Sequence, residues 1–311
     1  MSVKDTVKAT LLLSFLSPFI AEVLSGSTPP LEALTNPFSF PLLWAFYGVG
    51  VIFVREAWIR LGRNYLSLMF LGFAYGIFEE GLVIQSWFNP TWPDLGIFAY
   101  YGRIWGINTT WAVWLTIFHA LMSITAPIII VDFIYPHLKR KEFVGKRNIL
   151  LLLLIMAIPT ILFYTQLANY QTPLPQYFVA VVLFLLSLIF AKKIKKESIA
   201  ISKWPLKHVF IYGFIISLLL FLTFTALPHS SITPIVPMAL GIFLVVHFYS
   251  HMHPLEEKGR YLLILGFLSF WFIPYDIILE INGIRGEAIL GPITFLAFIL
   301  LWGERKLDYK N

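Results

Sequence analysis

Two adjacent glutamates and one histidine are the residues of this sequence best suited to carry chemistry. Glu79 and Glu80 stand in the apolar stretch 65–87, and His119 stands in the next apolar stretch, 108–135. Ionisable residues in such stretches are costly to place in a membrane, and we treat them as functional by default. A carboxylate can act as a general base on water, and an imidazole can stabilise a developing oxyanion. We therefore predict that these three side chains form a catalytic centre.

Further polar residues fall at similar depths on four predicted helices. Helices rise 1.5 Å per residue, so the position of a residue along its stretch gives its depth. By this measure the glutamate pair and His119 lie in the outer half of the membrane, and the other candidates lie near it. We expect the first, third, fourth and ninth helices to surround a polar cavity that opens outward. The residues assigned to this cavity as substrate or ion contacts are Glu22, Tyr75, Thr116, Ser123, Asp276 and Glu280.

The elements that must position these residues are membrane-spanning helices. Of 311 residues, 58% are hydrophobic and 13% are charged, whereas soluble domains carry about 25% charged residues. A helix needs about 20 mostly apolar residues to cross the hydrocarbon. We predict an all-α integral membrane protein, a single polytopic domain over residues 1–311. Its ten spans are 7–25, 38–56, 65–87, 108–135, 147–166, 175–192, 207–227, 232–250, 261–281 and 287–303.

The basic residues predict the orientation of these spans. All of them except Arg103 and Arg285 fall in the N-terminal segment, in alternate loops or in the C-terminal tail. Because cytoplasmic loops carry the excess of Lys and Arg, we place both termini in the cytoplasm and the protein in the cell membrane. The net charge of +6 then reflects inner loops that contact anionic lipid headgroups of the bilayer, and it implies no nucleic acid partner.

Several familiar kinds of site are excluded or left unassigned. The chain has no cysteine, so it has no disulfide, no thiolate metal ligand and no cysteine nucleophile. It contains no phosphate-binding loop, no glycine-rich dinucleotide fingerprint and no zinc-protease helix motif. We interpret His247, His251 and His253 as a cytosolic rim. The sequence leads us to assign no metal site, and it identifies no cofactor.

The loop between the third and fourth spans is unusually aromatic. Residues 87–105 include three tryptophans, two tyrosines and two phenylalanines. Such a segment either lies in the membrane interface as part of an aromatic belt or folds over the cavity as a lid. Asn108, at the start of the fourth span, is interpreted as a helix cap.

Two short stretches carry resemblances to known proteins. Ser25-Gly26-Ser27-Thr28-Pro29-Pro30 and Tyr75-Gly76-Ile77-Phe78-Glu79-Glu80-Gly81-Leu82 resemble uncharacterised multi-pass membrane proteins of archaea and bacteria. The order of the glutamate pair and His119 on consecutive helices is similar to that of the CAAX-protease and bacteriocin-processing (CPBP) intramembrane proteases. That resemblance implies a glutamate protease. It departs at Ile84, where those proteins have arginine, and at Leu115, where they have phenylalanine.

Three classes of function remain open. The glutamate–histidine site predicts a hydrolase that acts on a peptide, another amide or an ester at the membrane. The alternative is a proton- or cation-coupled secondary transporter, because carboxylates and histidines inside a membrane also serve as relays. The third class is a membrane assembly partner without chemistry. The sequence does not separate a peptide from a small-molecule substrate.

Overall fold

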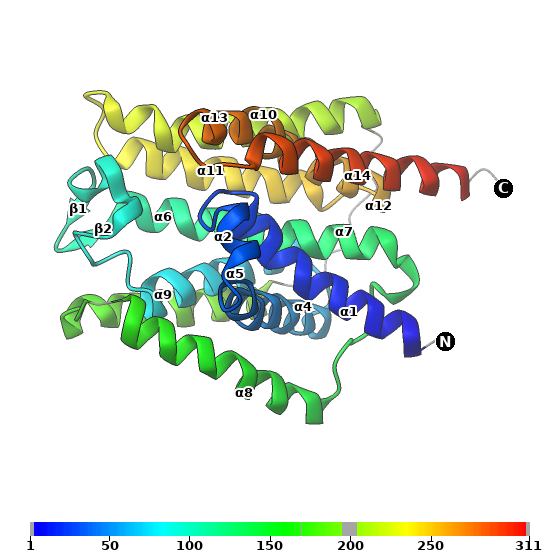
Figure 1. Ribbon diagram of the computed structural model, residues 1–311, viewed down its shortest axis with the longest axis horizontal. Coiled ribbons are helices and arrows are strands. Elements are labelled where there is room, and N and C mark those ends of the chain that lie inside the picture. Colours follow the sequence, from blue (N-terminus) through cyan, green and yellow to red (C-terminus); the bar gives the residue numbers. More distant parts are fainter. Residues whose placement is uncertain (1–2, 169, 195–203, 309–311) are drawn as a thin grey trace.

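Long apolar helices dominate the part of the chain that the structure describes. The computed structural model describes residues 3–168, 170–194 and 204–308, and within these ranges ten helices are long and apolar enough to cross a membrane (Figure 1). The predicted all-α, ten-helix membrane fold is confirmed. The helices span Lys4–Val23, Ser39–Arg60, Tyr65–Val83, Thr109–Ile134, Arg147–Leu167, Leu174–Lys193, Leu206–His229, Ile235–Met252, Glu257–Ile281 and Glu287–Glu304.

Many spans are built from several helical elements in direct succession. The first five consist of α1 (Val3–Pro18) with η1 (Phe19–Val23); α3 (Ser39–Leu43), η2 (Trp44–Gly48) and α4 (Val49–Arg60); α5 (Tyr65–Gly76) with η3 (Ile77–Val83); α6 (Thr109–Phe118), η5 (His119–Thr125) and α7 (Ala126–Ile134); and α8 (Lys146–Leu162) with η7 (Phe163–Leu167). The last five consist of α9 (Leu174–Lys193); α10 (Leu206–Thr225) with η8 (Leu227–His229); α11 (Ile235–Met252); α12 (Glu257–Phe270), η9 (Trp271–Tyr275) and α13 (Asp276–Ile281); and α14 (Glu287–Asp308).

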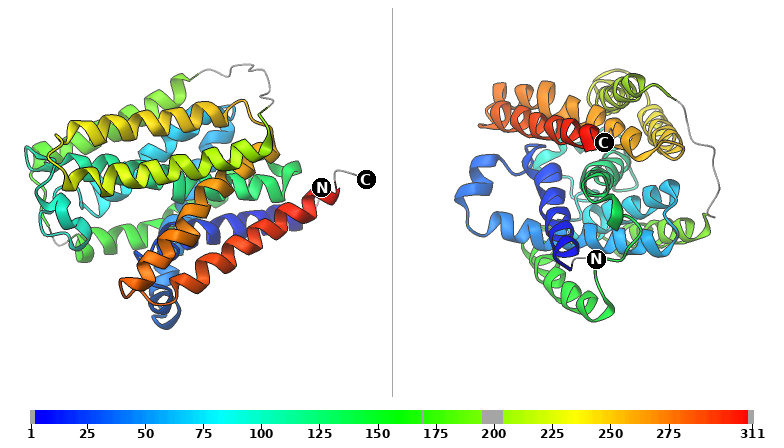
Figure 2. Two further views of the ribbon diagram at one scale, coloured as in Figure 1. Left: turned by 90° about the horizontal axis from the view of Figure 1, so that it is seen from above. Right: turned by 90° about the vertical axis from the view of Figure 1, so that its right-hand side faces the viewer.

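The fourth span lies at the centre of the bundle. Its elements contact the first span through α1, the third through α5, the eighth through α11 and the ninth through α12. A helix that is apolar on every side is stable only when neighbours cover it, and nearly all side chains of this span are buried. The fifth, sixth and tenth spans lie at the periphery and expose most of their apolar side chains (Figures 1 and 2).

Both described ends of the chain lie at the same end of the bundle, as an even number of spans requires (Figure 1). The cytoplasmic location of this end, and its contact with lipid headgroups, stay predictions. Part of the predicted headgroup-binding loop, Lys195, Lys196 and Lys203, lies outside the described residues, as does Lys310.

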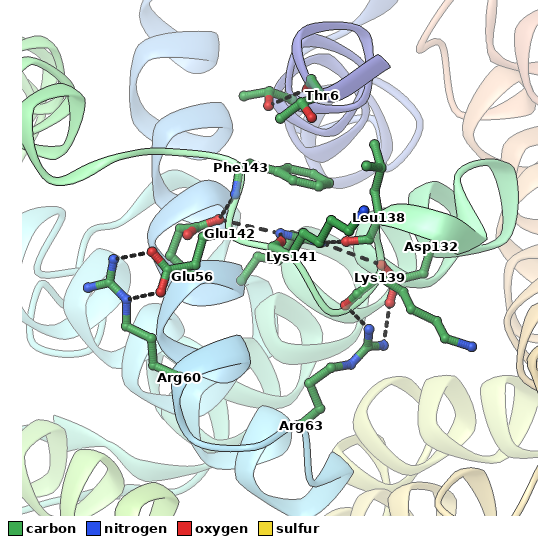
Figure 3. A network of polar contacts seen from close by, with 12 residues as sticks. Thr6, Glu56, Arg60, Arg63, Asp132, Leu138, Lys139, Lys141, Glu142 and Phe143 are labelled. Atoms are coloured by element: carbon green, nitrogen blue, oxygen red, sulfur yellow. Dashed lines mark hydrogen bonds and ion pairs between the residues drawn. The ribbon is translucent and has the colours of Figure 1, made fainter. Parts of the chain in front are cut away.

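Polar contacts hold this end of the bundle together (Figure 3). Arg63 extends toward Asp132 and toward the backbone of Lys139, with 2.5 Å between Nη2 of Arg63 and Oδ2 of Asp132. Arg60 forms a two-pronged pair with Glu142, at 3.2 and 3.1 Å. Charged side chains thus join the second span and the loop after it to the fourth span and the segment that follows it.

Short elements fill the connections. They are α2 (Pro30–Thr35), η4 (Pro93–Ala99), β1 (Arg103–Ile104), β2 (Ile107–Asn108) and η6 (Pro136–Leu138). The two strands form an antiparallel hairpin in which Arg103 pairs with Asn108. This hairpin belongs to the aromatic loop, for which the sequence predicted no strand.

Candidate functional site

The helices that supply the site leave the regular α-helical path where they do so. Glu22 lies in η1, Tyr47 in η2, Glu79 and Glu80 in η3, and His119 in η5, and each of these elements is π-helical. A π-helical turn adds a residue to the α-helical repeat, which turns the following side chains around the axis. Such turns are rare and are often found at functional sites. Four of the six π-helical elements among the described residues thus supply side chains to this region.

Two glycines let the third and fourth spans approach closely enough to form the site. A Cβ atom added to Gly72 would lie 2.8 Å from the Cα of Ala120. One added to Gly76 would lie 3.1 Å from the Cα of Thr116 and 3.2 Å from the Cβ of His119. Small residues four apart allow such close contact between membrane helices. The glycine pair thereby sets the short distance between η3 and His119.

We expect the Gly72→Ala variant to be less stable than the wild type by about 1–3 kcal/mol, because the added methyl group overlaps backbone atoms that cannot move independently. Thermal unfolding of the purified protein in detergent measures the change. The matched control is Gly303→Ala on α14, where an added Cβ would meet no atom within 4 Å. Equal unfolding temperatures for the two variants would refute the role given to Gly72.

His119 lies between the two glutamates. Its Nδ1 atom is 3.3 Å from Oε2 of Glu79, and its Nε2 atom is 3.1 Å from Oε1 of Glu80. Nδ1 also contacts the hydroxyl of Ser123 at 2.9 Å. The exposed fractions of Glu79, Glu80 and His119 are only 3%, 9% and 2%. Three ionisable groups are therefore brought together inside the bundle, where charges are tolerated only when paired or hydrogen-bonded.

A shell of hydroxyl groups orients these side chains. The Tyr47 hydroxyl is 2.5 Å from Oε1 of Glu22 and also contacts Oε1 of Glu79. Ser86 donates a hydrogen bond to Oε2 of Glu80. Each glutamate of the pair thus has one carboxylate oxygen held by a hydroxyl donor.

This shell extends further along the chain. The indole Nε1 of Trp111 donates to the hydroxyl of Ser86 at 3.1 Å, and Thr28 donates to Oε2 of Glu22 at 3.0 Å. The Tyr47 hydroxyl thus links a carboxyl group of the first span to one of the third span.

A cavity of about 470 Å³ reaches the three ionisable residues. Its volume is in the range that accommodates a small molecule or a short peptide segment. The cavity is acidic, because five carboxylates line it. Among the described residues that line it, His119 is the one basic side chain, and none is a lysine or an arginine. Aromatic side chains form much of the remaining wall. The carboxylates are Glu22, Glu32, Glu79, Glu80 and Asp94, and the aromatic residues are Phe38, Tyr47, Trp92, Trp111, Phe118 and Phe163.

Most of the sequence-predicted site residues meet in this region. Glu22 lines the cavity together with Glu79, Glu80 and His119. Ser123 contacts His119, and the ring of Tyr75 packs beside it with 6.2 Å between ring centroids. Thr116 lies on the same helix, against Gly76. These last three residues support His119 and are not among the residues that line the cavity.

The structure does not bring Asp276 and Glu280 to the cavity. Asp276 is fully buried, and a Cβ added to Gly291 of α14 would overlap its carboxylate. Glu280 accepts a hydrogen bond of 2.7 Å from the N–H of Gly286 and lies 3.6 Å from Arg285. Both residues face the tenth span because η9 and α13 pack against α14. The ninth span is therefore replaced at the cavity by the second span, which supplies Tyr47.

The aromatic loop contributes to the cavity wall. Trp92 and Asp94 line it, while Trp87 and Phe88 are buried in the protein. The side chain of Asn108 accepts a hydrogen bond of 3.1 Å from the N–H of Trp111, so it caps α6 as expected. Of the two interpretations of this loop, these contacts favour a cover over the cavity.

Comparisons with known proteins place the chain in a family. A protein from Archaeoglobus fulgidus, described only as an uncharacterized protein, is 29% identical over 126 residues, which are 40% of this chain and 38% of that relative. No solved structure matches the chain. The model of a family described as "Uncharacterized membrane protein family" matches residues 11–274. This chain is therefore a multi-pass membrane protein that belongs to that family.

Proposed function

We propose that this protein is a hydrolase that cleaves an amide or ester bond inside the membrane, with Glu79, Glu80 and His119 as its catalytic residues. The observation that carries the proposal is the placement of His119 between two buried carboxylates on the wall of a substrate-sized cavity. General acid–base chemistry needs such groups within hydrogen-bond reach of one another and of a common water molecule. A helix-packing role would require neither the cavity nor the surrounding hydroxyl donors.

The proposed reaction uses water from the cavity. A carboxylate of the pair takes a proton from the water molecule. At the same time the oxygen of that water attacks the carbonyl carbon of the substrate. Nε2 of His119 stabilises the oxyanion that forms. The proton then passes to the leaving nitrogen or oxygen as the bond to carbon breaks, which yields a carboxylic acid and an amine or alcohol. The acidic and aromatic walls favour substrates with a positively charged group near the scissile bond.

The resemblance to CPBP proteases supports this class of reaction. Those proteins pair adjacent glutamates with a histidine on the following helix, as this chain does. The two departures, Ile84 and Leu115, both line the cavity. Apolar side chains at these positions would shape a substrate pocket unlike that of a protein with arginine and phenylalanine there. The reaction class is therefore proposed without the substrates of that family.

A proton-coupled transporter is the second candidate. The observation that favours it is the contact of Tyr47 with both Glu22 and Glu79, since a carboxyl–phenol–carboxyl chain can pass a proton along the cavity wall. In that case the acidic cavity would bind a cation that moves against the proton.

The two candidates are separated by one experiment on the full chain in liposomes. The protein is incubated with a library of peptides and acyl esters in water enriched in oxygen-18, while a pH-sensitive dye inside the vesicles records proton flux. Hydrolysis places one heavy oxygen in the new carboxyl group, which mass spectrometry detects. Substrate-dependent proton flux without labelled product would overturn the hydrolase proposal in favour of transport.

A further inference from the structure

Glu79, Glu80 and His119 each have one possible ligand atom that no surrounding hydroxyl group contacts. The Tyr47 hydroxyl contacts Oε1 of Glu79, and Ser86 donates to Oε2 of Glu80. Ser123 contacts Nδ1 of His119 at 2.9 Å. Outside these hydroxyl contacts remain Oε2 of Glu79 and the pair formed by Oε1 of Glu80 and Nε2 of His119, which are hydrogen-bonded to each other at 3.1 Å.

These three residues bring possible ligand atoms close together. Each of them offers one donor atom, and these atoms lie within 4.8 Å of one another. Nε2 of His119 and Oε1 of Glu80 are 3.1 Å apart. Oε2 of Glu79 is buried and accepts no hydrogen bond; it lies 3.3 Å from Nδ1 of His119, a nitrogen that also contacts Ser123 at 2.9 Å. A buried carboxylate oxygen without a hydrogen-bond donor is costly, and a bound cation would remove that cost.

The geometry points to a binding site for one divalent transition-metal ion at Glu79, Glu80 and His119, with Zn²⁺ as the preferred ion. Zinc binds imidazole nitrogen and carboxylate oxygen at about 2.0–2.2 Å, so two ligands of a tetrahedral site lie about 3.3 Å apart. Imidazole favours zinc and its transition-metal neighbours over Mg²⁺ and Ca²⁺, which prefer oxygen ligands. The sequence alone led us to assign no metal site to these residues.

The hydroxyl shell supplies the second feature expected of such a site. Metal-bound histidines usually hold their other ring nitrogen in a hydrogen bond, and metal-bound carboxylates are themselves hydrogen-bonded. Ser123, Tyr47 and Ser86 occupy these positions. Three protein ligands would leave one coordination position open toward the cavity, as in catalytic zinc sites. When bound, the ion would occupy Nε2 of His119 and would supply in its place the positive charge that stabilises the oxyanion of the proposed hydrolysis. In this respect alone the inference rests on the proposed function.

Metal content of the full chain is the direct test. The protein is purified in detergent without a histidine tag, stripped with a chelator, and dialysed against buffered free Zn²⁺ or Co²⁺. Mass spectrometric metal analysis should find one ion per chain, and Co²⁺ should show the strong visible absorption of a tetrahedral site. Glu79→Gln, Glu80→Gln and His119→Gln should each lower affinity by at least about 100-fold. Ser86→Ala, which keeps all three ligands, should lower it by about 10–100-fold.

Two sets of controls separate this site from others on the chain. Asp276→Asn and Glu287→Gln remove buried carboxylates that stand away from the cavity, and both should keep the metal. The double variant His247→Ala/His251→Ala removes neighbouring imidazoles whose ring centroids are 4.1 Å apart, and it should also keep the metal. A wild-type protein with less than a tenth of an ion per chain overturns the inference. So does metal that survives Glu79→Gln and is lost in the histidine double variant.

Failure of the metal site and failure of the proposed function give different results. Hydrolysis by wild-type protein that takes up less than a tenth of an ion per chain would reject the metal site and keep the hydrolase. One bound ion per chain, lost in Glu80→Gln, with no hydrolysis of any substrate would keep the metal site and reject the hydrolase.

Discussion

Replacing Glu80 by glutamine should lower turnover by the reconstituted protein by about 10²–10⁴-fold, the range that general acid–base catalysis contributes. Glutamine has nearly the shape of glutamate and keeps a carbonyl oxygen for the hydrogen bond from Ser86. It lacks the negative charge that would accept a proton or hold an ion. The same loss is expected for Glu79→Gln, because Glu79 lies on the other side of the His119 ring.

The fold should survive these two substitutions. A charged side chain deep in the membrane costs about 2.5–3.5 kcal/mol on insertion scales, so its removal does not penalise folding by itself. Substrate binding should therefore persist while turnover is lost. The measurements are initial rates in liposomes, thermal unfolding in detergent and binding of a labelled substrate.

Glu287→Gln is the matched control for both variants. Glu287 is as fully buried as Glu79 and Glu80 and undergoes the same chemical change, but it lies away from the cavity. Its turnover should equal that of the wild type. In a proton-coupled transporter, Glu79→Gln would instead uncouple flux from the pH gradient and still permit exchange. Wild-type turnover in both glutamate variants would remove this site from the mechanism.

The ten helices were predictable because hydropathy is a local property. A segment that crosses the bilayer must be long, apolar and hydrogen-bonded within itself, whatever its neighbours are. The same reasoning gives each residue a depth along its helix. Glu79, Glu80 and His119 could be grouped in advance because they share a depth and stand on helices joined by one loop.

Which side chains of a helix point toward the cavity could not be predicted in the same way. Asp276 has a suitable depth, but the packing of η9 and α13 on α14 turns it away from the cavity. Tyr47 gave no signal, since a tyrosine in an apolar span is an ordinary residue until Glu22 and Glu79 are found beside it. The π-helical turns change the direction in which side chains point from a helix, and the hydropathy pattern of the sequence does not predict where such turns occur.

At the other end of the second span, replacement of Arg55 by methionine should destabilise the protein by about 3–5 kcal/mol, the cost of removing one partner from a buried charge network. Arg55 is fully buried. Its guanidinium donates to the carbonyl oxygens of Lys141 at 3.0 Å and Leu138 at 3.1 Å, and it lies 3.3 Å from a carboxylate oxygen of Glu56. Methionine fills similar space but donates no hydrogen bond to either carbonyl oxygen and carries no charge to pair with Glu56.

Arg60→Met is the matched control, because Arg60 lies on the same helix as Arg55 and pairs with a glutamate at a largely exposed position. Exposed pairs contribute roughly 0–1 kcal/mol, so its loss should be small. Arg55→Lys should fall between the two, since an ammonium keeps the charge but cannot span both carbonyl groups as the guanidinium fork does. Unfolding followed in detergent gives the three values. Equal stabilities for Arg55→Met and Arg60→Met would contradict the role of Arg55 as the central link between the second span and the segment that follows the fourth.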